Sequence, residues 1–273
     1  MSSFSFGFTL GKAKKAGGVS YDADAQAFFT ATGITDTTQK SAVNQLVLDL
    51  KSYNIWTKMK AIYPFVGGSA SSHKYNLKDS RDLNAAFRLT FSTGWTHSST
   101  GATPNGAAYA NTFLTPSTSL SLNSTHLSFY SRTNSANTNN YDIGSSTLSG
   151  VSQYTLMILR EGNTFYNAIN VAQGNAAGVT NNDSSGFFIA SRTASNVLSG
   201  FRNSTKILTA SNTSSILPTA SIFLSALNSS GSANFYSIKQ CAFASIGNGL
   251  TDTESTNFYT AVNTYQTTLS RNV

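Results

Sequence analysis

The chain has 273 residues, of which 40% are hydrophobic and only 11% are charged, against about 25% in an average soluble domain. Ser, Thr and Asn together make up about 37% of it, a composition more typical of secreted β-sandwiches, adhesins, lectins and virion proteins than of cytosolic metabolic enzymes. The 18 Phe, 12 Tyr and 2 Trp along the chain argue against intrinsic disorder. We therefore expect one large β domain, with or without a small helical attachment.

The net charge of +7 comes from 18 basic and 11 acidic residues. A nucleic-acid-binding protein normally clusters its basic residues on one face, so we expect no nucleic-acid partner, although the short cluster Lys12, Lys14 and Lys15 is an alternative contact for phosphate or acidic protein. No apolar stretch approaches the length of a membrane span, and residues 1–10 lack the pattern of a signal peptide. We expect synthesis in the cytoplasm and no membrane partner.

Charge is uneven along the chain, because the first 82 residues hold 16 of the 29 charged groups. This change in density predicts three parts: an N-terminal arm over residues 1–17, a helical segment for packing or attachment over residues 18–69, and a sandwich over residues 70–273. The dense charge patch at residues 78–82 is expected to be a set of local ion pairs of little energetic worth, or alternatively a docking point for a neighbouring subunit.

Two helices are predicted in the helical segment. Asp22 can cap the first, which stops near Gly33. Asp36 and Gln39 have capping-box spacing at the start of the second. Its apolar residues recur at helical spacing and are Val43, Leu46, Val47 and Leu50.

From about residue 73 the pattern changes to short β-forming runs separated by Gly, Asn and Ser clusters. Ten such runs without intervening helices indicate an antiparallel sandwich or jelly roll. Thr251 and Glu254 then form a capping box, which predicts a closing helix over residues 251–270. The predicted strands are His73–Leu77, Ala86–Phe91, Tyr109–Leu114, Leu127–Arg132, Tyr154–Arg160, Phe165–Ile169, Phe187–Ser191, Ile207–Ala210, Ile222–Ala226 and Phe235–Ser245.

The C-terminal pattern of a β run ending at Gly247, a Leu-Thr-Asp-Thr-Glu helix start and Tyr259 resembles the closing element of concanavalin-A-like, laminin-G-like jelly-roll domains. Over most of the chain, four strings resemble a module of tailed-bacteriophage structural proteins, which include fibre and head-decorating proteins. These strings are Ala61–Gly68, His73–Asp79, Gly94–Ser98 and Tyr265–Leu269. The resemblance implies a virion component with a lectin-like sandwich, whose partners are other virion proteins or further copies of itself in a homo-oligomer.

Catalysis is not expected. Retaining glycosidases need two carboxylates about 5 Å apart, and the only two glutamates of the chain are Glu161 and Glu254. Glu254 is explained as a helix cap and Glu161 as a turn residue. We therefore expect a non-enzymatic virion structural protein, on the capsid or in a tail fibre, that contacts host-surface glycans. The alternatives are a soluble bacterial carbohydrate-binding module and a pure assembly protein with no ligand.

Sugar binding requires planar hydrogen-bonding groups beside an aromatic ring. The candidate carbohydrate-binding residues that supply both types are Trp95, His97, Tyr130, Arg132, Asn140 and Tyr141. For the first two, the alternative is that Trp95 belongs to the core and His97 caps a turn.

No cofactor is expected, with calcium as the alternative. Asp142 and Asp183 follow asparagines in polar loops and are the candidate calcium ligands, each with a turn role as its alternative. The single cysteine, Cys241, excludes a disulfide within the chain and a cysteine-based metal site.

Overall fold

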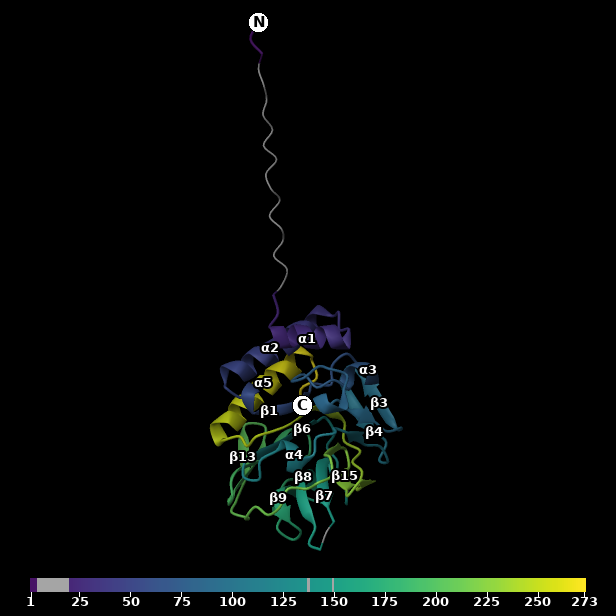
Figure 1. Ribbon diagram of the computed structural model, residues 1–273, viewed down its shortest axis with the longest axis vertical. Coiled ribbons are helices and arrows are strands. Elements are labelled where there is room, and N and C mark those ends of the chain that lie inside the picture. The colour runs from purple at the N-terminus through teal and green to yellow at the C-terminus, as the bar shows by residue number, and fades with distance from the viewer. Residues whose placement is uncertain (4–19, 137, 149) are drawn as a thin grey trace.

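The computed structural model describes residues 1–3, 20–136, 138–148 and 150–273, and these form three layers (Figure 1). Helices cover one face of a first sheet, and a second sheet packs against the other face. The predicted fold class, an antiparallel β-sandwich with N-terminal helices and a C-terminal helix, is confirmed. Most of the predicted arm, with its three lysines, lies outside the described residues.

The first sheet has eight strands in the order β13-β12-β11-β6-β17-β4-β3, with β1 paired to β17. All of its pairs are antiparallel. Its strands are β1 (Met59–Tyr63), β3 (Trp95–Ser98), β4 (Gly101–Pro104), β6 (Thr125–Ser131), β11 (Gly186–Ala194), β12 (Val197–Arg202), β13 (Thr205–Ala210) and β17 (Cys241–Gly247).

The second sheet has nine strands in the order β10-β9-β8-β7-β14-β5-β2, with the hairpin β15–β16 attached to β7. The pair β15–β7 is parallel, whereas the long hairpins β7–β8 and β8–β9 are antiparallel. Its strands are β2 (Thr90–Phe91), β5 (Ala110–Asn111), β7 (Ile143–Thr147), β8 (Gln153–Glu161), β9 (Thr164–Ala172), β10 (Ala177–Thr180), β14 (Phe223–Leu224), β15 (Leu227–Ser229) and β16 (Ser232–Asn234).

Three helices form the third layer, and side-chain caps fix where each of them begins. Asp22 accepts a hydrogen bond from the Asp24 N–H and starts α1 (Ala23–Thr32). The Asp36 side chain accepts a hydrogen bond from the Gln39 N–H and starts α2 (Thr37–Ser52). Thr251 forms a capping box before α5 (Asp252–Thr268). The described residues also form short helical turns, which are α3 (Ala70–His73), α4 (Pro116–Ser119), η1 (Trp56–Lys58) and η2 (Asn84–Ala86).

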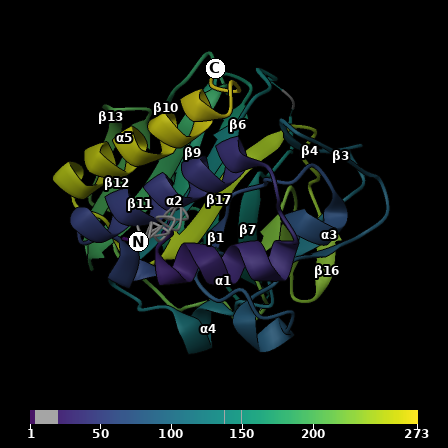
Figure 2. The same ribbon diagram turned by 90° about the horizontal axis from the view of Figure 1, so that it is seen from above.

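The first sheet lies between the helices and the second sheet, so both of its faces are buried. Side chains alternate along its strands, and successive residues therefore belong to opposite faces. On β11, Phe187 belongs to the core under the helices and Phe188 to the core between the sheets. Figure 2 shows α2 and α5 side by side across β17, β6 and β11. We call this outer side of the first sheet the helix-covered face.

Arg271 ties the C-terminus to the helix-covered face, and its side chain is only 1% exposed. The guanidinium donates to the carbonyl oxygens of Pro64 (2.8 Å), Phe65 (2.7 Å) and Ala242 (2.9 Å) and to Oε1 of Gln266 (2.6 Å). The helical segment and the sandwich thus share one core, and the role of that segment in attachment stays a prediction.

Two of the strand predictions are wrong in identifiable ways, and one strand was missed. His73–Leu77 is not a strand, because the Ser69 side chain caps a helical turn, α3, that includes His73. The run Phe235–Ser245 becomes a strand only at Cys241. Strand β1 was missed, because four of its five residues are buried and a strand buried on both faces shows no alternation.

Candidate functional site

The outer side of the second sheet lies farthest from the helices (Figure 1), and alternation identifies the residues on it. On β9, the Phe165 ring stacks on Phe188 of the first sheet with centroids 5.8 Å apart. The Asn167 side-chain amide donates to the Ser199 carbonyl, also in the first sheet, at 2.9 Å. Since both point inward, Tyr166 between them points outward.

The register between β8 and β9 extends this outward set. Ile158 lies opposite Tyr166, and Leu156 lies opposite Ala168. Tyr154 is on the same side of β8 as both, because side chains two residues apart share a face. Leu156 and Ile158 are only 3% and 4% exposed although no sheet covers them, so neighbouring side chains on this face shield them.

Tyr141 joins this set just before β7. Its ring stacks on Phe235 with centroids 4.9 Å apart. Burial raises the pKa of Tyr141, and the proximity of Glu161, Tyr154 and Tyr166 raises it further. The three half-buried tyrosines therefore share one neighbourhood, which we call the tyrosine face: Tyr141, Tyr154 and Tyr166 around Leu156 and Ile158.

Glycines keep the tyrosine face open. Gly178 on β10 is exposed, and a Cβ there would lie 3.0 Å from Cε1 of Tyr166. A Cβ on Gly144 of β7 would lie 2.5 Å from Cβ of Leu156. The two glycines thus allow the neighbouring side chains to lie directly over the strand backbones.

A fixed polar border lies at the turn between β8 and β9. Arg160 donates from Nη1 to Oδ1 of Asn134 (2.9 Å) and from Nη2 to Oδ1 of Asn163 (2.8 Å). Glu161 accepts the Asn139 N–H at 3.0 Å. Aromatic rings with an apolar body and a polar tip, next to oriented polar groups, can contact both the apolar and the polar parts of a small molecule.

Trp95 and His97 lie at a different place, on β3 at the edge of the first sheet. The Trp95 indole donates to the Tyr109 carbonyl at 3.1 Å and packs edge-on against Phe91. The Nδ1 atom of His97 lies 2.9 Å from Nδ1 of His73, so one imidazole donates to the other. His97 is paired within the fold, and the structure does not bring it together with the tyrosine face.

His73 was not among the predicted site residues. It is 1% exposed, and burial, with smaller effects of His97 and Arg271, lowers its pKa to about 3. Its place in an expected strand concealed the pairing with His97, and no local signal in the sequence indicates it.

The structure places two of the predicted sugar contacts beside the C-terminus. Tyr130 is 1% exposed in the core beneath the helices, and its hydroxyl accepts the Val273 N–H at 2.8 Å. Arg132 donates to the Arg271 carbonyl (2.8 Å) and to Oε1 of Gln240 (3.0 Å). Both side chains therefore hold the C-terminus in place. Tyr130 is buried within β6, which corrects its prediction as a sugar contact, whereas Arg132 lies just after β6 and is half-buried, so its contact with a sugar stays a prediction.

Tyr141 is the predicted residue that belongs to the tyrosine face, and Asn140, its half-buried neighbour in the chain, precedes it. Period-two spacing of Tyr154, Leu156 and Ile158 could have indicated the remainder. The signal was hidden, because the intervening residues of β8 are also apolar and buried.

The predicted calcium ligands have protein partners instead. Asp142 is fully buried and lies 3.2 Å from Nζ of Lys239, so it does not line a loop rim as predicted. Asp183 accepts from the Ser185 N–H (2.8 Å) and pairs with Arg202. Within the described ranges, no group of three His, Cys, Asp or Glu side chains could hold a metal ion.

The two glutamates also have structural partners. Glu254 caps α5 and forms an ion pair with Lys58 at 2.6 Å, while Glu161 receives the backbone N–H of Asn139.

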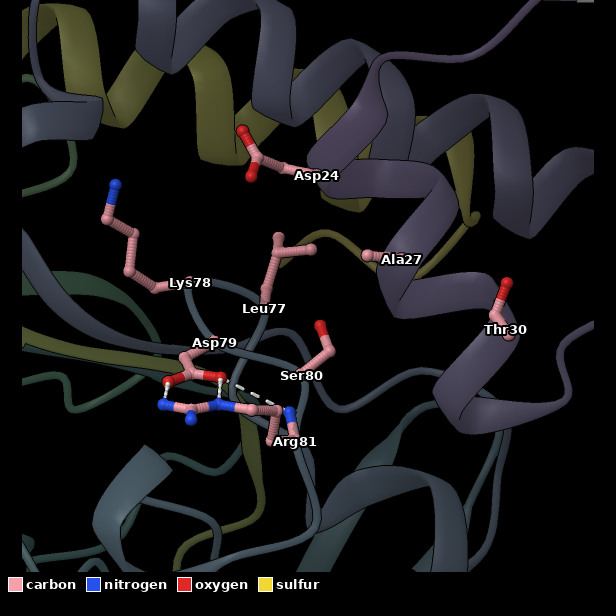
Figure 3. A pocket seen from close by; sticks show the side chains of 8 residues that line it. All are labelled: Asp24, Ala27, Thr30, Leu77, Lys78, Asp79, Ser80 and Arg81. Carbon is pink, nitrogen blue, oxygen red and sulfur yellow. Dashed lines mark hydrogen bonds and ion pairs between the residues drawn. The ribbon is translucent and has the colours of Figure 1, made fainter.

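A groove of about 540 Å³ lies between α1 and residues 77–81 (Figure 3). Its charged groups are largely paired: Arg81 folds back on Asp79 with two hydrogen bonds, and Asp24 pairs with Lys51 at 2.6 Å. Lys78 lies with its ammonium 4.3 Å from the Trp56 ring centroid. Among the described residues no aromatic ring lines the groove, so it offers a sugar less than the tyrosine face does.

No protein-family model and no curated protein matches the chain. Among solved structures, a Trypanosoma rangeli sialidase mutant displaying trans-sialidase activity matches with a TM-score of 0.52 at 8% identity, over 81% of this chain and 39% of the sialidase. Domain 4 of an extracellular arabinanase from Geobacillus stearothermophilus, in complex with arabinotriose, matches with a TM-score of 0.49 at 11% identity, over 74% and 98%. The botulinum neurotoxin serotype D binding domain matches with a TM-score of 0.47 at 9% identity, over 76% and 52%.

These likenesses concern the fold. At such low identity no residue role carries over, and the chain spans well under half of the sialidase, so the activity of that enzyme is not carried over either. None of the helices in the described part of the chain is long and apolar enough to cross a bilayer.

Proposed function

We propose that the protein is a carbohydrate-binding module and that the tyrosine face is its glycan-binding surface. The observation that carries the proposal is the cluster of three half-buried tyrosines on the large sheet face that none of the three long helices of the described residues covers. The C–H groups of a sugar ring pack well on an aromatic face, and the phenol hydroxyls supply hydrogen bonds at the edge.

The low charge of the sandwich fits this proposal. Residues 83–273 contain only 13 charged groups, so recognition relies on hydroxyl, amide and aromatic groups. Such contacts are individually weak, and display in several copies makes them effective through avidity.

The test is binding of the full chain, immobilised in many copies on beads, to an array of neutral and sialylated oligosaccharides. We expect binding to a subset of glycans and a loss of at least tenfold in Tyr154→Ala and in Tyr166→Ala. Tyr259→Ala is the matched control, because Tyr259 is a half-buried tyrosine on α5, on the opposite side of the molecule.

Two outcomes would refute the proposal. One is the absence of binding to every glycan on the array by beads that carry the folded protein. The other is binding that Tyr259→Ala weakens as much as Tyr166→Ala does.

Placement of this module on a virion, as a homo-oligomer or bound to other virion proteins, is a separate proposal that rests on the sequence resemblance. Antibody labelling of native particles tests it. Labelled particles without glycan binding would favour an assembly protein, whereas glycan binding by a free monomer would favour a soluble module.

A further inference from the structure

A buried polar cluster joins the two sheets at one end of the sandwich. Asp142 immediately precedes β7 of the second sheet, and Lys239 lies two residues before β17 of the first. Both side chains are 0% exposed, and Lys239 Nζ lies 3.2 Å from Oδ1 of Asp142. The two residues are held in place by a backbone bridge between Tyr141 and Tyr236.

The contact between Lys239 and Asp142 is not a hydrogen bond. Although the two atoms are close, their angles do not fit one, and Nζ has no hydrogen-bond partner in the described part of the chain. A buried ammonium carries three donors and a full charge. Burying such a group without hydrogen bonds is costly, even beside an opposite charge.

The carboxyl group, by contrast, is well held. Oδ2 of Asp142 accepts the Leu159 N–H at 2.8 Å, and Oδ1 accepts the Ser237 hydroxyl at 2.7 Å. These donors draw electron density from Cγ and would stabilise the negative oxygen that forms when a nucleophile adds to it. The nitrogen is therefore positioned within reach of an activated carbonyl carbon.

We propose that Lys239 and Asp142 form an intramolecular isopeptide bond that cross-links the two sheets. The ammonium passes one proton to the carboxylate, and the neutral amine attacks Cγ. The Cγ–O bond then breaks, a second proton from nitrogen goes to the departing hydroxyl, and one water molecule leaves. The reaction converts an ammonium and a carboxylate into one amide and one water, with no oxidant, reductant or other reactant.

The product suits the site better than the ion pair does. An amide carries no charge and has one N–H in place of three donors. The Ser225 hydroxyl, buried and without a partner in the described residues, belongs to the same cluster, since the Ser225 N–H donates to the Asp142 carbonyl at 2.8 Å. A covalent link across so many residues also restricts the unfolded chain.

The experiment is the intact mass of the purified, folded full chain measured after denaturation. We expect it to be lighter than the sequence mass by one water molecule. Tandem mass spectrometry should find a branched peptide that joins Asp142 to Lys239, and trypsin should not cut after Lys239.

Variants separate the isopeptide from other losses of water. Lys239→Met should restore the full sequence mass, whereas a succinimide elsewhere would persist in it. Asp142→Asn should lose ammonia in place of water. Lys206→Met is the matched control and should keep the water deficit, because Lys206 forms a surface ion pair with Asp252 at 3.0 Å.

A wild-type mass equal to the sequence mass, both in fresh protein and after prolonged incubation in the folded state, would overturn the proposal. A water deficit whose tandem spectra place it away from Lys239 would do the same. Both readings come from the wild-type chain, so they hold even if Lys239→Met does not fold.

Discussion

The two outer faces of this sandwich differ in what covers them. On the helix-covered face, Phe187 of β11 and Phe243 of β17 pack edge-on against Phe258 of α5, with centroids 5.1 and 5.9 Å apart. On the tyrosine face, Tyr154 and Tyr166 lie beside strand backbone and solvent. The two sheets are similar in size, so size does not determine which outer face is buried. The side chains on each outer face, and the helices that pack on one of them, determine it.

The contrast separates stability from recognition. Aromatic side chains that lie between two layers contribute most of their area to the core. Half-buried tyrosines next to glycine leave part of each ring free for a ligand. Changes on the helix-covered face should therefore affect unfolding, whereas changes on the tyrosine face should affect binding.

The largest effect is expected for Arg271→Met, which removes the donors that link the C-terminus to the backbone at Pro64, Phe65 and Ala242. The Pro64 and Ala242 carbonyls keep Tyr265 and Gln266 as donors at 3.0 and 3.3 Å, but hydrogen bonds from a charged group are worth about 1.5–3 kcal/mol each. Since several such bonds are lost together, we expect at least about 3 kcal/mol less stability in urea unfolding. Arg160→Met is the control from the border of the tyrosine face. Equal losses in the two variants would contradict the division between the faces.

A second effect depends on pH and comes from His126, which is fully buried on β6 beneath α5. Its Nδ1 lies 2.6 Å from the Asn248 carbonyl and its Nε2 lies 3.0 Å from Oγ of Ser245. Burial lowers its pKa from 6.5 to about 4. Below 6.5 the unfolded chain therefore binds a proton that the folded chain does not.

Neutral, buried His126 therefore contributes stability above pH 6.5, and this contribution is lost as the pH falls toward the folded pKa of about 4. The loss is about 1.4 kcal/mol per pH unit for one histidine. Urea unfolding of wild type and His126→Gln from about pH 7 to about pH 4 measures it, since titrating carboxylates affect both proteins alike. Parallel pH profiles would show that His126 is not the group responsible.

Local signals in the sequence were enough for much of the fold. The caps at Asp22, Asp36 and Thr251 located the three long helices, because a cap acts within one turn of chain. Strands β6, β8, β9 and β11 followed from runs of β-forming residues between turns. The β-sandwich class followed from the number of such runs.

The site was harder to predict, since it depends on which strands pair. Tyr141 and Tyr166 share one neighbourhood only because β7, β8 and β9 form neighbouring hairpins, and propensities do not specify the outward side. Tyr130 illustrates the converse error, because its strand was predicted but the sequence does not show that this strand, β6, lies at the centre of the first sheet with every residue buried. The contact of Lys239 with Asp142 joins residues nearly a hundred positions apart, so no local pattern indicates it.

The smallest expected effect on stability is at Gly178. In Gly178→Ala the new methyl group would lie 3.0 Å from Cε1 of Tyr166, which is the end of a side chain that can move. We expect a change within about 0.5 kcal/mol, since the gain in strand propensity offsets the contact, but weaker glycan binding because the ring is displaced.

Gly247→Ala is the matched change on the helix-covered face. There the methyl group would lie 2.3 Å from the Lys58 carbonyl oxygen, which belongs to backbone held in the sheet, so about 1–3 kcal/mol should be lost. If Gly178→Ala unfolded as easily as Gly247→Ala, the tyrosine face would be part of the packed core and not a surface open to a ligand.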